Sequence, residues 1–336
     1  MRKLTVPALL LAALAAGCES GNVLEAESTG AVRGVAFLDR NGNGTGEASD
    51  RPFRVAEVRL VTPGSGTVVG RATTDSTGFF IIPDVPIGRY QVTVAPESLA
   101  DSVQMLPPPV EVSVPPQDTV DVAVGVTYPK VTVEEARTLP LGRRVFVEGT
   151  VVGAYADTAH LTGATRSIRA TRLAAGSGSI NPTQLPGDSV RILGVTARNR
   201  GQPTLDDALL FQLSSRVIPP PVQTNTGTAA AGGGGTLDAA QVQVRNAVVQ
   251  DTFSVEGEWY LRLDDGSGPV NFWLGPRINF RSTGFVPGAR VIATGVLAPN
   301  PNGAGWRIRW RRAEEDLVFV GLSADVARDV RRPGPG

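Results

Sequence analysis

The sequence predicts an all-β protein, and three observations support this prediction. Glycine occurs 39 times and proline 26 times in 336 residues, whereas methionine occurs 2 times, a composition typical of many short strands joined by turns. Stretches such as Tyr90–Val94 alternate apolar and polar residues, as a half-buried strand requires. Two blocks in the second half recur at similar spacing, which indicates a duplicated fold. The chain length is sufficient for two or three domains.

Residues 1–17 are predicted to be an export leader. A positively charged start precedes an apolar run, residues 4–16, which is shorter than the roughly 18 residues needed to cross a bilayer. Cys18, the one cysteine of the sequence, follows directly. This arrangement resembles a bacterial lipoprotein signal (the lipobox), although Ala15 stands where that family prefers leucine. The resemblance implies that Cys18 is diacylated and becomes the mature N-terminus. The alternative is an ordinary secretory signal with an incidental cysteine.

Lipidation would place the protein outside the cytoplasm, attached to the cell envelope by its lipid. Glu19 follows the cysteine, so the aspartate that resembles an inner-membrane retention signal is missing. We therefore expect the outer membrane, with the protein facing the periplasm or the cell surface. Residues 18–30 are mostly small and polar and are expected to form a tether.

Residues 31–128 are predicted to form a seven-stranded β-sandwich. Turn residues separate the apolar stretches at intervals suited to that fold. The expected strands are Val32–Leu38, Glu57–Val61, Thr67–Thr73, Phe79–Ile82, Tyr90–Val94, Val110–Val114 and Val120–Val126.

The segment 39–50 has the pattern of a calcium-binding loop. Oxygen-bearing side chains occupy loop positions 1, 3, 5, 9 and 12, glycine occupies position 6, and the residue at position 7 can offer its carbonyl. The candidate ligands are Asp39, Asn41, Asn43, Thr45, Glu47 and Asp50. Aspartate at position 12, in place of the usual glutamate, would weaken the affinity. The pattern favours a structural Ca²⁺ ion, and the alternative is an Asx-rich turn that needs no metal.

Three motifs of this segment, 32–39 with the loop, 74–80 and 86–90, resemble SdrD B-like and carboxypeptidase-regulatory-like modules. The resemblance implies a prealbumin-like sandwich of the kind found in surface stalks, adhesive modules and carbohydrate-contacting modules. Some members of that superfamily carry a Lys–Asn crosslink. No lysine occurs between Lys3 and Lys130, so such a bond cannot form within this module.

The second half is predicted to contain two copies of one barrel. The block 145–152 corresponds to 242–249, and the block 186–195 corresponds to 287–296. The repeat resembles tandem OB-fold modules of exported bacterial proteins, so the whole chain is expected to be a seven-stranded β-sandwich followed by two OB-like β-barrels. The expected boundaries are 131–217 for the first barrel, 218–235 for a Pro/Gly linker, 236–321 for the second barrel and 322–336 for a disordered tail.

The OB resemblance implies a site at which bases or sugars stack on aromatic side chains in a basic groove. The candidate ligand-binding residues are Trp259, Tyr260, Phe272, Trp273, Arg262 and Arg277. Each aromatic pair is adjacent in the sequence, so one member of each pair should point outward. The alternation over residues 306–311 instead favours a half-buried strand, with its tryptophans in the core and its arginines in water.

Composition argues against catalysis. His160 is the one histidine, so neither a Cys–His pair nor a histidine-based zinc site can be assembled. Residues 131–336 hold 22 basic and 18 acidic residues, a net charge of +4 that is small for a nucleic-acid binder. The predicted function is a non-enzymatic envelope lipoprotein that displays binding or scaffold modules. The expected partners are the membrane and a glycan or envelope protein, and the alternative is accessory binding of single-stranded nucleic acid or carbohydrate.

Overall fold

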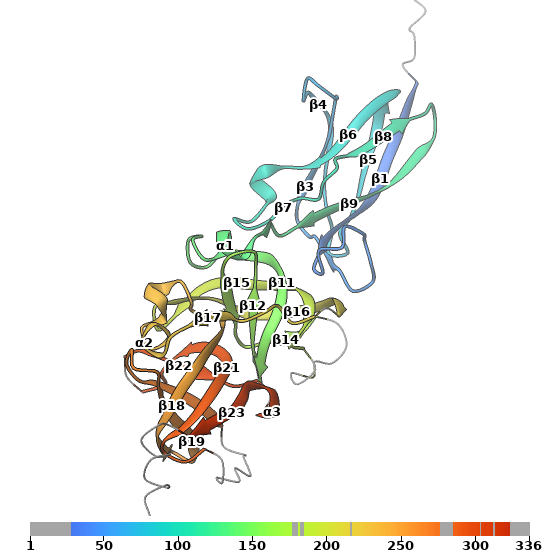
Figure 1. Cartoon of the computed structure of the whole chain (residues 1–336). Coiled ribbons are helices and arrows are strands. Elements are labelled where there is room, and N and C mark those ends of the chain that lie inside the picture. Colours follow the sequence, from blue (N-terminus) through green and yellow to red (C-terminus); the bar gives the residue numbers. More distant parts are fainter. Residues whose placement is uncertain are drawn as a thin grey trace, which may run out of the picture.

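The computed structural model describes residues 28–176, 181, 185–215, 217–275, 285–302, 304–311 and 313–322. The predicted leader, the lipidation candidate Cys18, most of the tether, nearly all of the predicted tail and Arg277 lie outside this range. Three β modules follow one another along an elongated molecule, with the sandwich at one end and the second barrel at the other (Figure 1). The predicted all-β class is confirmed.

Two sheets form the N-terminal sandwich. All seven predicted strands are present, and two short strands, β2 and β7, extend one of the sheets. The first sheet has the order β2 (Arg51–Pro52), β1 (Thr29–Asp39), β9 (Thr119–Thr127), β7 (Gln104–Met105), with β5 (Phe79–Pro86) also paired to β1. The second has the order β4 (Val68–Thr73), β3 (Glu57–Val61), β6 (Gly88–Val94), β8 (Val110–Val114).

The alternation that predicted these strands also builds the sandwich core. Val58 and Leu60 of β3 are fully buried, and Phe80 and Ile82 of β5 are 2% exposed, so each strand buries every second side chain. Burying a side chain of this kind contributes about 1.5–3 kcal/mol. Gly34 allows β1 to lie against β9, because a Cβ at this position would fall 2.0 Å from the Val122 carbonyl oxygen.

The first barrel closes through consecutive strand pairings that return to their starting strand. Its strands are β11 (Arg144–Tyr155), β12 (Thr158–Thr162), β13 (Ser167–Ala170), β16 (Gln202–Ser215) and β15 (Asp188–Asn199), with β10 (Lys130–Val131) and β14 (Ala174–Ala175) at its margins. A short helix, α1 (Val133–Ala136), begins with a capping box between Thr132 and Glu135 and buries Val133 in the barrel core.

The second barrel repeats this pairing pattern. Its strands are β18 (Gln241–Val255), β19 (Glu258–Asp264), β20 (Val270–Gly275), β22 (Trp306–Arg309) and β21 (Ala289–Pro299). A further helix, α3 (Ala313–Asp316), leads into an edge strand, β23 (Leu317–Leu322), which pairs with β21.

The predicted linker over residues 218–235 is wrong for most of its length. It contains β17 (Val222–Thr224), paired in parallel with β18, and α2 (Thr226–Ala230), followed by a 3-10 turn, η2 (Gly232–Gly235). Ala229 of α2 is fully buried in the barrel core. The segment folds because Asn225 caps α2, its side chain accepting a hydrogen bond from the Thr228 amide. The second barrel therefore begins near residue 222, with the same strand–helix entry as the first.

No helix in the described part of the chain is long and apolar enough to span a membrane.

Candidate functional site

The sandwich contacts the first barrel through a defined set of residues, which we call the sandwich seam. Arg191 of β15 donates a hydrogen bond to the Asn41 carbonyl at 2.7 Å and forms an ion pair with Glu148 at 2.8 Å. Glu148 also pairs with Lys130 at 2.7 Å. Gly42 lies on the ring of Phe146, so that a Cβ there would stand 3.2 Å from the ring carbons. The predicted calcium loop is therefore one of the parts of the sandwich that contact the barrel, together with Asp101 and Ser102.

The two barrels meet at a second interface, the barrel seam. On the first barrel it contains a row of cross-strand neighbours: Gly153, His160, Arg169 and Thr204. Their sequence neighbours Leu161, Ile168 and Leu205 are in the barrel core, so this row faces outward. It is nevertheless covered: His160 is 0% and Thr204 is 1% exposed, and a Cβ on Gly153 would fall 2.6 Å from Val296 of the second barrel.

His160 is held neutral in this seam. Burial lowers the pKa of its imidazole well below 6.5, and the positive charges of Arg309 and Arg169 lower the pKa further. Neither ring nitrogen makes a hydrogen bond of normal geometry, although the backbone at Ala239 approaches the ring and slightly favours its protonated form. The ring packs edge-on against Tyr155 at 5.8 Å. The one histidine of the chain therefore serves packing between modules.

Arginines of the second barrel complete the seam. Arg309 lies between two rings, with its guanidinium carbon 3.9 Å from the centroid of Tyr155 and 4.3 Å from that of Trp273. The Tyr155 hydroxyl donates to the Arg309 carbonyl at 3.0 Å. A buried ion pair joins Arg137 of the first barrel to Asp238 of the second at 2.8 Å, with side chains 11% and 4% exposed.

The strand containing residues 306–309 differs from its prediction. Its arginines are not in water: Arg307 is 9% exposed and donates to the Tyr260 hydroxyl at 2.7 Å, and Arg309 lies in the barrel seam. The core side chain of this strand is Ile308, whereas Trp306 and Trp310 are only partly buried against the core. The predicted alternation is present, but the face that carries the arginines packs against aromatic rings of neighbouring strands and of the first barrel.

The six predicted ligand-binding residues do not form one exposed groove. Phe272 is fully buried in the core, and Tyr260 and Trp273 are 5% and 9% exposed, so none of these three rings offers an open surface for stacking. The Tyr260 hydroxyl and the Trp273 ring nitrogen each donate a hydrogen bond to the Glu258 carboxylate at 2.9 Å. Trp259 is 42% exposed. Arg262 is exposed and stacks on Phe253. The sixth candidate, Arg277, lies outside the described residues.

The loop over residues 39–50 gathers most of its predicted oxygens. Asn41 and Asn43 both donate to the Glu47 carboxylate, and the Thr45 hydroxyl donates to the Asn43 side-chain oxygen. Asp39 is fully buried, and its two oxygens accept hydrogen bonds from the amides of Gly42 and Gly44 at 2.7 and 2.9 Å.

Asp50, like Asp39, bonds to backbone amides of the loop. Its oxygens accept from the Arg40 and Glu47 amides, so it closes the loop. Within the described residues no three His, Cys, Asp or Glu side chains are grouped as a metal site. An ion in this loop would therefore depend on amide and carbonyl oxygens beside Asp39 and Glu47, a donor set that suits a hard cation such as Ca²⁺.

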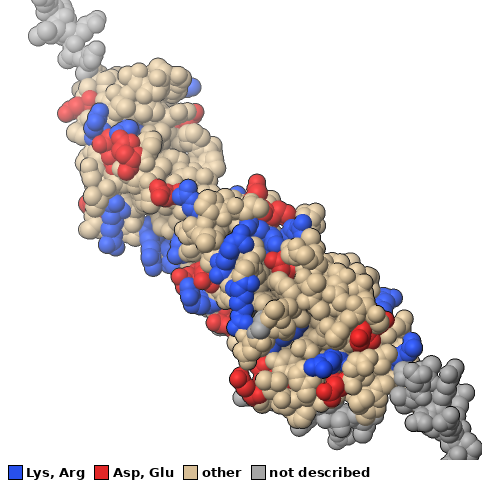
Figure 2. Space-filling model, turned by 90° about the vertical axis from the view of Figure 1, so that its left-hand side faces the viewer, with Lys and Arg blue, Asp and Glu red and all other residues tan. Residues whose placement is uncertain are grey.

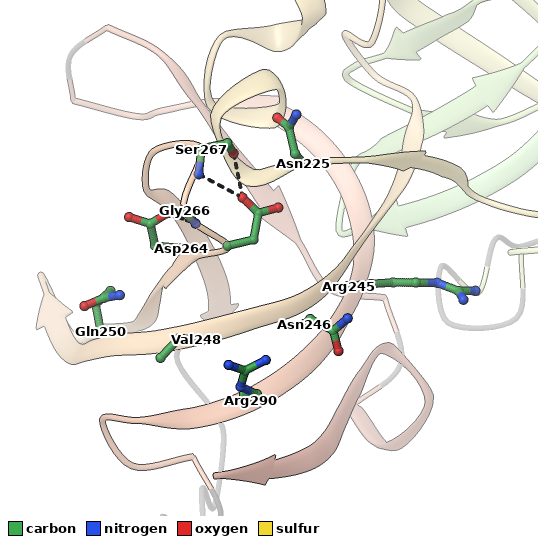
Figure 3. Close-up of a pocket in the computed structure, with 10 residues that line it drawn as sticks. Asn225, Arg245, Asn246, Val248, Gln250, Asp264, Gly266, Ser267 and Arg290 are labelled. Atoms are coloured by element: carbon green, nitrogen blue, oxygen red, sulfur yellow. Dashed lines mark hydrogen bonds between the residues drawn. The ribbon is translucent and has the colours of Figure 1, made fainter. Parts of the chain in front are cut away.

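A pocket of about 730 Å³ lies on the second barrel between β18, β21 and the β19–β20 turn. In Figure 3, Asn246, Val248 and Arg290 lie along one side, across from the turn at Asp264–Ser267 and from Asn225. None of these residues is among the predicted ligand-binding residues. The sequence repeat could have indicated this pocket, because Arg245 stands at the position that Glu148 occupies in the first barrel.

Comparison with known proteins reveals only distant structural similarity. The sequence matches no family model and no curated protein. A minor pilin of Streptococcus agalactiae is 17% identical over 31% of this chain and 48% of its own length, about half of the pilin, with a TM-score of 0.25. A putative carbohydrate-binding protein of Pseudomonas aeruginosa is 17% identical over 29% of this chain and 88% of its own, with a TM-score of 0.21.

A murine DNA-binding protein bound to double-stranded DNA is 12% identical over 57% of this chain and 99% of its own length, with a TM-score of 0.29. These scores are too low to carry an argument about function.

Proposed function

We propose that this chain is a non-catalytic lipoprotein of the cell envelope, anchored through Cys18, that holds its second barrel away from the membrane on a stiff stack of modules. The observation that carries the proposal is the pair of seams. Arg191 bonds to the sandwich from the first barrel, Arg137 pairs with Asp238 of the second barrel, and Arg309 stacks on Tyr155 of the first barrel. The side chains of Arg191 and Arg137 are 15% and 11% exposed. Modules joined by specific, mostly buried contacts behave as a spacer, in contrast to domains on flexible linkers.

The anchor is tested by expressing the full chain in a bacterial host with two membranes and comparing it with Cys18→Ser. We expect the parent to fractionate with membranes and its N-terminal peptide to begin at a diacylated Cys18. The variant should be soluble outside the cytoplasm, because it lacks the acyl chains that supply membrane affinity. Equal fractionation of the two proteins, or a mature terminus elsewhere with a free thiol, would rule out the lipid anchor.

A calcium ion in the 39–50 loop belongs to the same proposal. Asp39, Asn41, Asn43, Thr45 and Glu47 would hold it, with Asp50 closing the loop behind them. The ion would neutralise neighbouring carboxylates and stiffen the loop that contacts Arg191 and Phe146 at the sandwich seam.

Calcium is therefore expected to raise the melting temperature of the protein relative to EDTA. At a concentration 100 times the dissociation constant, the free energy of unfolding should rise by about 2.7 kcal/mol. Glu47→Gln should remove most of this increase, whereas Glu111→Gln, at an exposed position of β8, should retain it. Identical melting curves in calcium and EDTA would instead identify the loop as a metal-free Asx turn.

A further inference from the structure

The pocket on the second barrel has an unneutralised basic side. No hydrogen bond or ion pair joins the half-buried Arg290 guanidinium to another described residue, and Arg245 donates only to the Gln243 side chain at 2.8 Å. Both arginines line the same cavity, whose volume is within the range of small-ligand sites. Unpaired guanidinium groups beside a cavity favour an oxyanion, since their fixed donors match carboxylate, sulfate and phosphate oxygens.

The carboxylates on the opposite side do not neutralise these arginines. Asp264 accepts hydrogen bonds from the amides of Gly266 and Gly268 at 2.8 and 3.2 Å. Asp265 accepts from Thr226 and Ser267, which joins the start of α2 to the β19–β20 turn. Both carboxylates shape the turn, and neither forms an ion pair with a described arginine. The positive charge of the pocket therefore remains available to a ligand.

The first barrel provides an internal comparison. Its corresponding pocket of about 450 Å³, beside the start of α1, is lined by Lys130 and Glu148. There Glu148 neutralises both Lys130 and Arg191, and this charge cluster belongs to the sandwich seam. The sequence repeat puts Arg245 at the Glu148 position of the second barrel. The second barrel therefore has an arginine, bonded to Gln243, where the first barrel has the carboxylate that closes an ion-pair network.

The remaining lining residues indicate the chemistry of the rest of the ligand. Asn225, Asn246, Gln250 and Ser267 offer amide and hydroxyl groups that can donate to and accept from hydroxyls. None of the described lining residues is aromatic, so the pocket has no platform on which a nucleobase could stack. We propose that this pocket binds an acidic polysaccharide, with its carboxylate or sulfate group on Arg290, Arg245 adding positive charge to the same lining, and its hydroxyls on the surrounding amides.

This inference extends the proposed envelope function by naming the ligand class that the displayed barrel takes. Binding can be measured by calorimetry with the purified full-length mature chain, using oligogalacturonate, dextran sulfate, neutral dextran and single-stranded oligothymidine as probes. We expect binding to at least one of the two acidic saccharides, weakening with added salt, and none to neutral dextran. Oligogalacturonate tests for recognition of a carboxylate, and dextran sulfate tests for recognition of a sulfate.

Two variants locate the site. Arg290→Gln should weaken binding about tenfold to a hundredfold, the loss expected for a hydrogen-bonded charge. Arg245→Glu, which restores the first barrel's carboxylate, should weaken binding at least as strongly, because it replaces a positive charge of the pocket lining with a negative one. Arg172→Gln is the matched control, because Arg172 is an exposed arginine of the first barrel that lies outside this pocket. Melting curves of each variant verify that the barrel remains folded.

Several results would overturn the inference: no acidic saccharide binds, neutral dextran binds equally, Arg290→Gln binds as tightly as the parent, or oligothymidine binds more tightly than either saccharide. The anchor is tested independently of this site. A lipidated chain that binds no saccharide would contradict only the proposed binding site. A chain that binds saccharide but carries no lipid would contradict only the proposed anchor.

Discussion

Replacing Asp238 with asparagine is expected to destabilise the contact between the two barrels by about 3–5 kcal/mol, the cost of removing one partner from a buried ion pair. Arg137 would keep its hydrogen bonds to the Ser167 and Gly235 carbonyls but would lose the carboxylate that neutralises it. The second barrel should then unfold at lower urea concentration than the rest of the chain. Tryptophan fluorescence reports this transition, because all four tryptophans lie at positions 259, 273, 306 and 310.

Asp121→Asn is the matched control for the Asp238 variant. It removes a carboxylate paired with Arg33 at 2.6 Å, but the two side chains are 70% and 49% exposed, so solvent screens the pair and the expected loss is far smaller than for Asp238. Equal effects of the two substitutions would show that the barrel seam contributes no more than a surface pair. The combined Arg137→Met, Asp238→Leu variant should regain stability, since neither buried charge is left unpaired.

Acid is expected to weaken the protein through His160. In the unfolded chain this imidazole has its ordinary pKa near 6.5, whereas in the folded chain burial and the charges of Arg309 and Arg169 lower that pKa well below 6.5. Below pH 6.5 the unfolded chain therefore binds a proton at His160 that the folded chain does not bind. Stability should be unaffected by His160 above pH 6.5 and should fall below it, by at most about 1.4 kcal/mol per pH unit, until the lowered folded pKa is reached.

The His160 contribution can be isolated by comparison with His160→Phe, which keeps an aromatic ring beside Tyr155 without a titrating group. Carboxylates titrate in both proteins, so the difference between their free energies of unfolding reports the imidazole alone. From pH 6.5 to 4.5 we expect the parent to lose more stability than the variant, because only the parent's unfolded chain gains a proton at this residue. Parallel pH profiles would mean that the ring is solvated or can accept a proton within the seam.

Local patterns were sufficient to predict much of the fold. Alternation located all seven major strands of the sandwich, and the duplicated blocks fall on β11 and β18 and on β15 and β21 of the two barrels. The segment 218–235 was misread because proline and glycine usually indicate a linker. The informative residue was Asn225, which starts a short helix as Thr132 does in the first barrel.

The site was much harder to predict, because burial by another module leaves no local pattern. Trp273 points outward from its own barrel, as expected of one member of the pair, but Tyr155 and Arg309 then cover it. Phe146 likewise alternates as an outward residue of its strand and is hidden beneath Gly42. In the second barrel the corresponding residue is Gln243, which donates to Thr294, so the copy that receives no sandwich has a polar surface there.

The two seams are expected to hold the three modules as one stiff body, and this stiffness can be measured as the distribution of distances between the two end modules. In a Cys18→Ser background, cysteines at the exposed positions Ser65 and Ser254 can carry spin labels on the sandwich and the second barrel. Double electron–electron resonance should give a single narrow distribution of label-to-label distances, which should broaden in Asp238→Asn. A broad distribution in the parent, unchanged by that substitution, would show that the modules move independently.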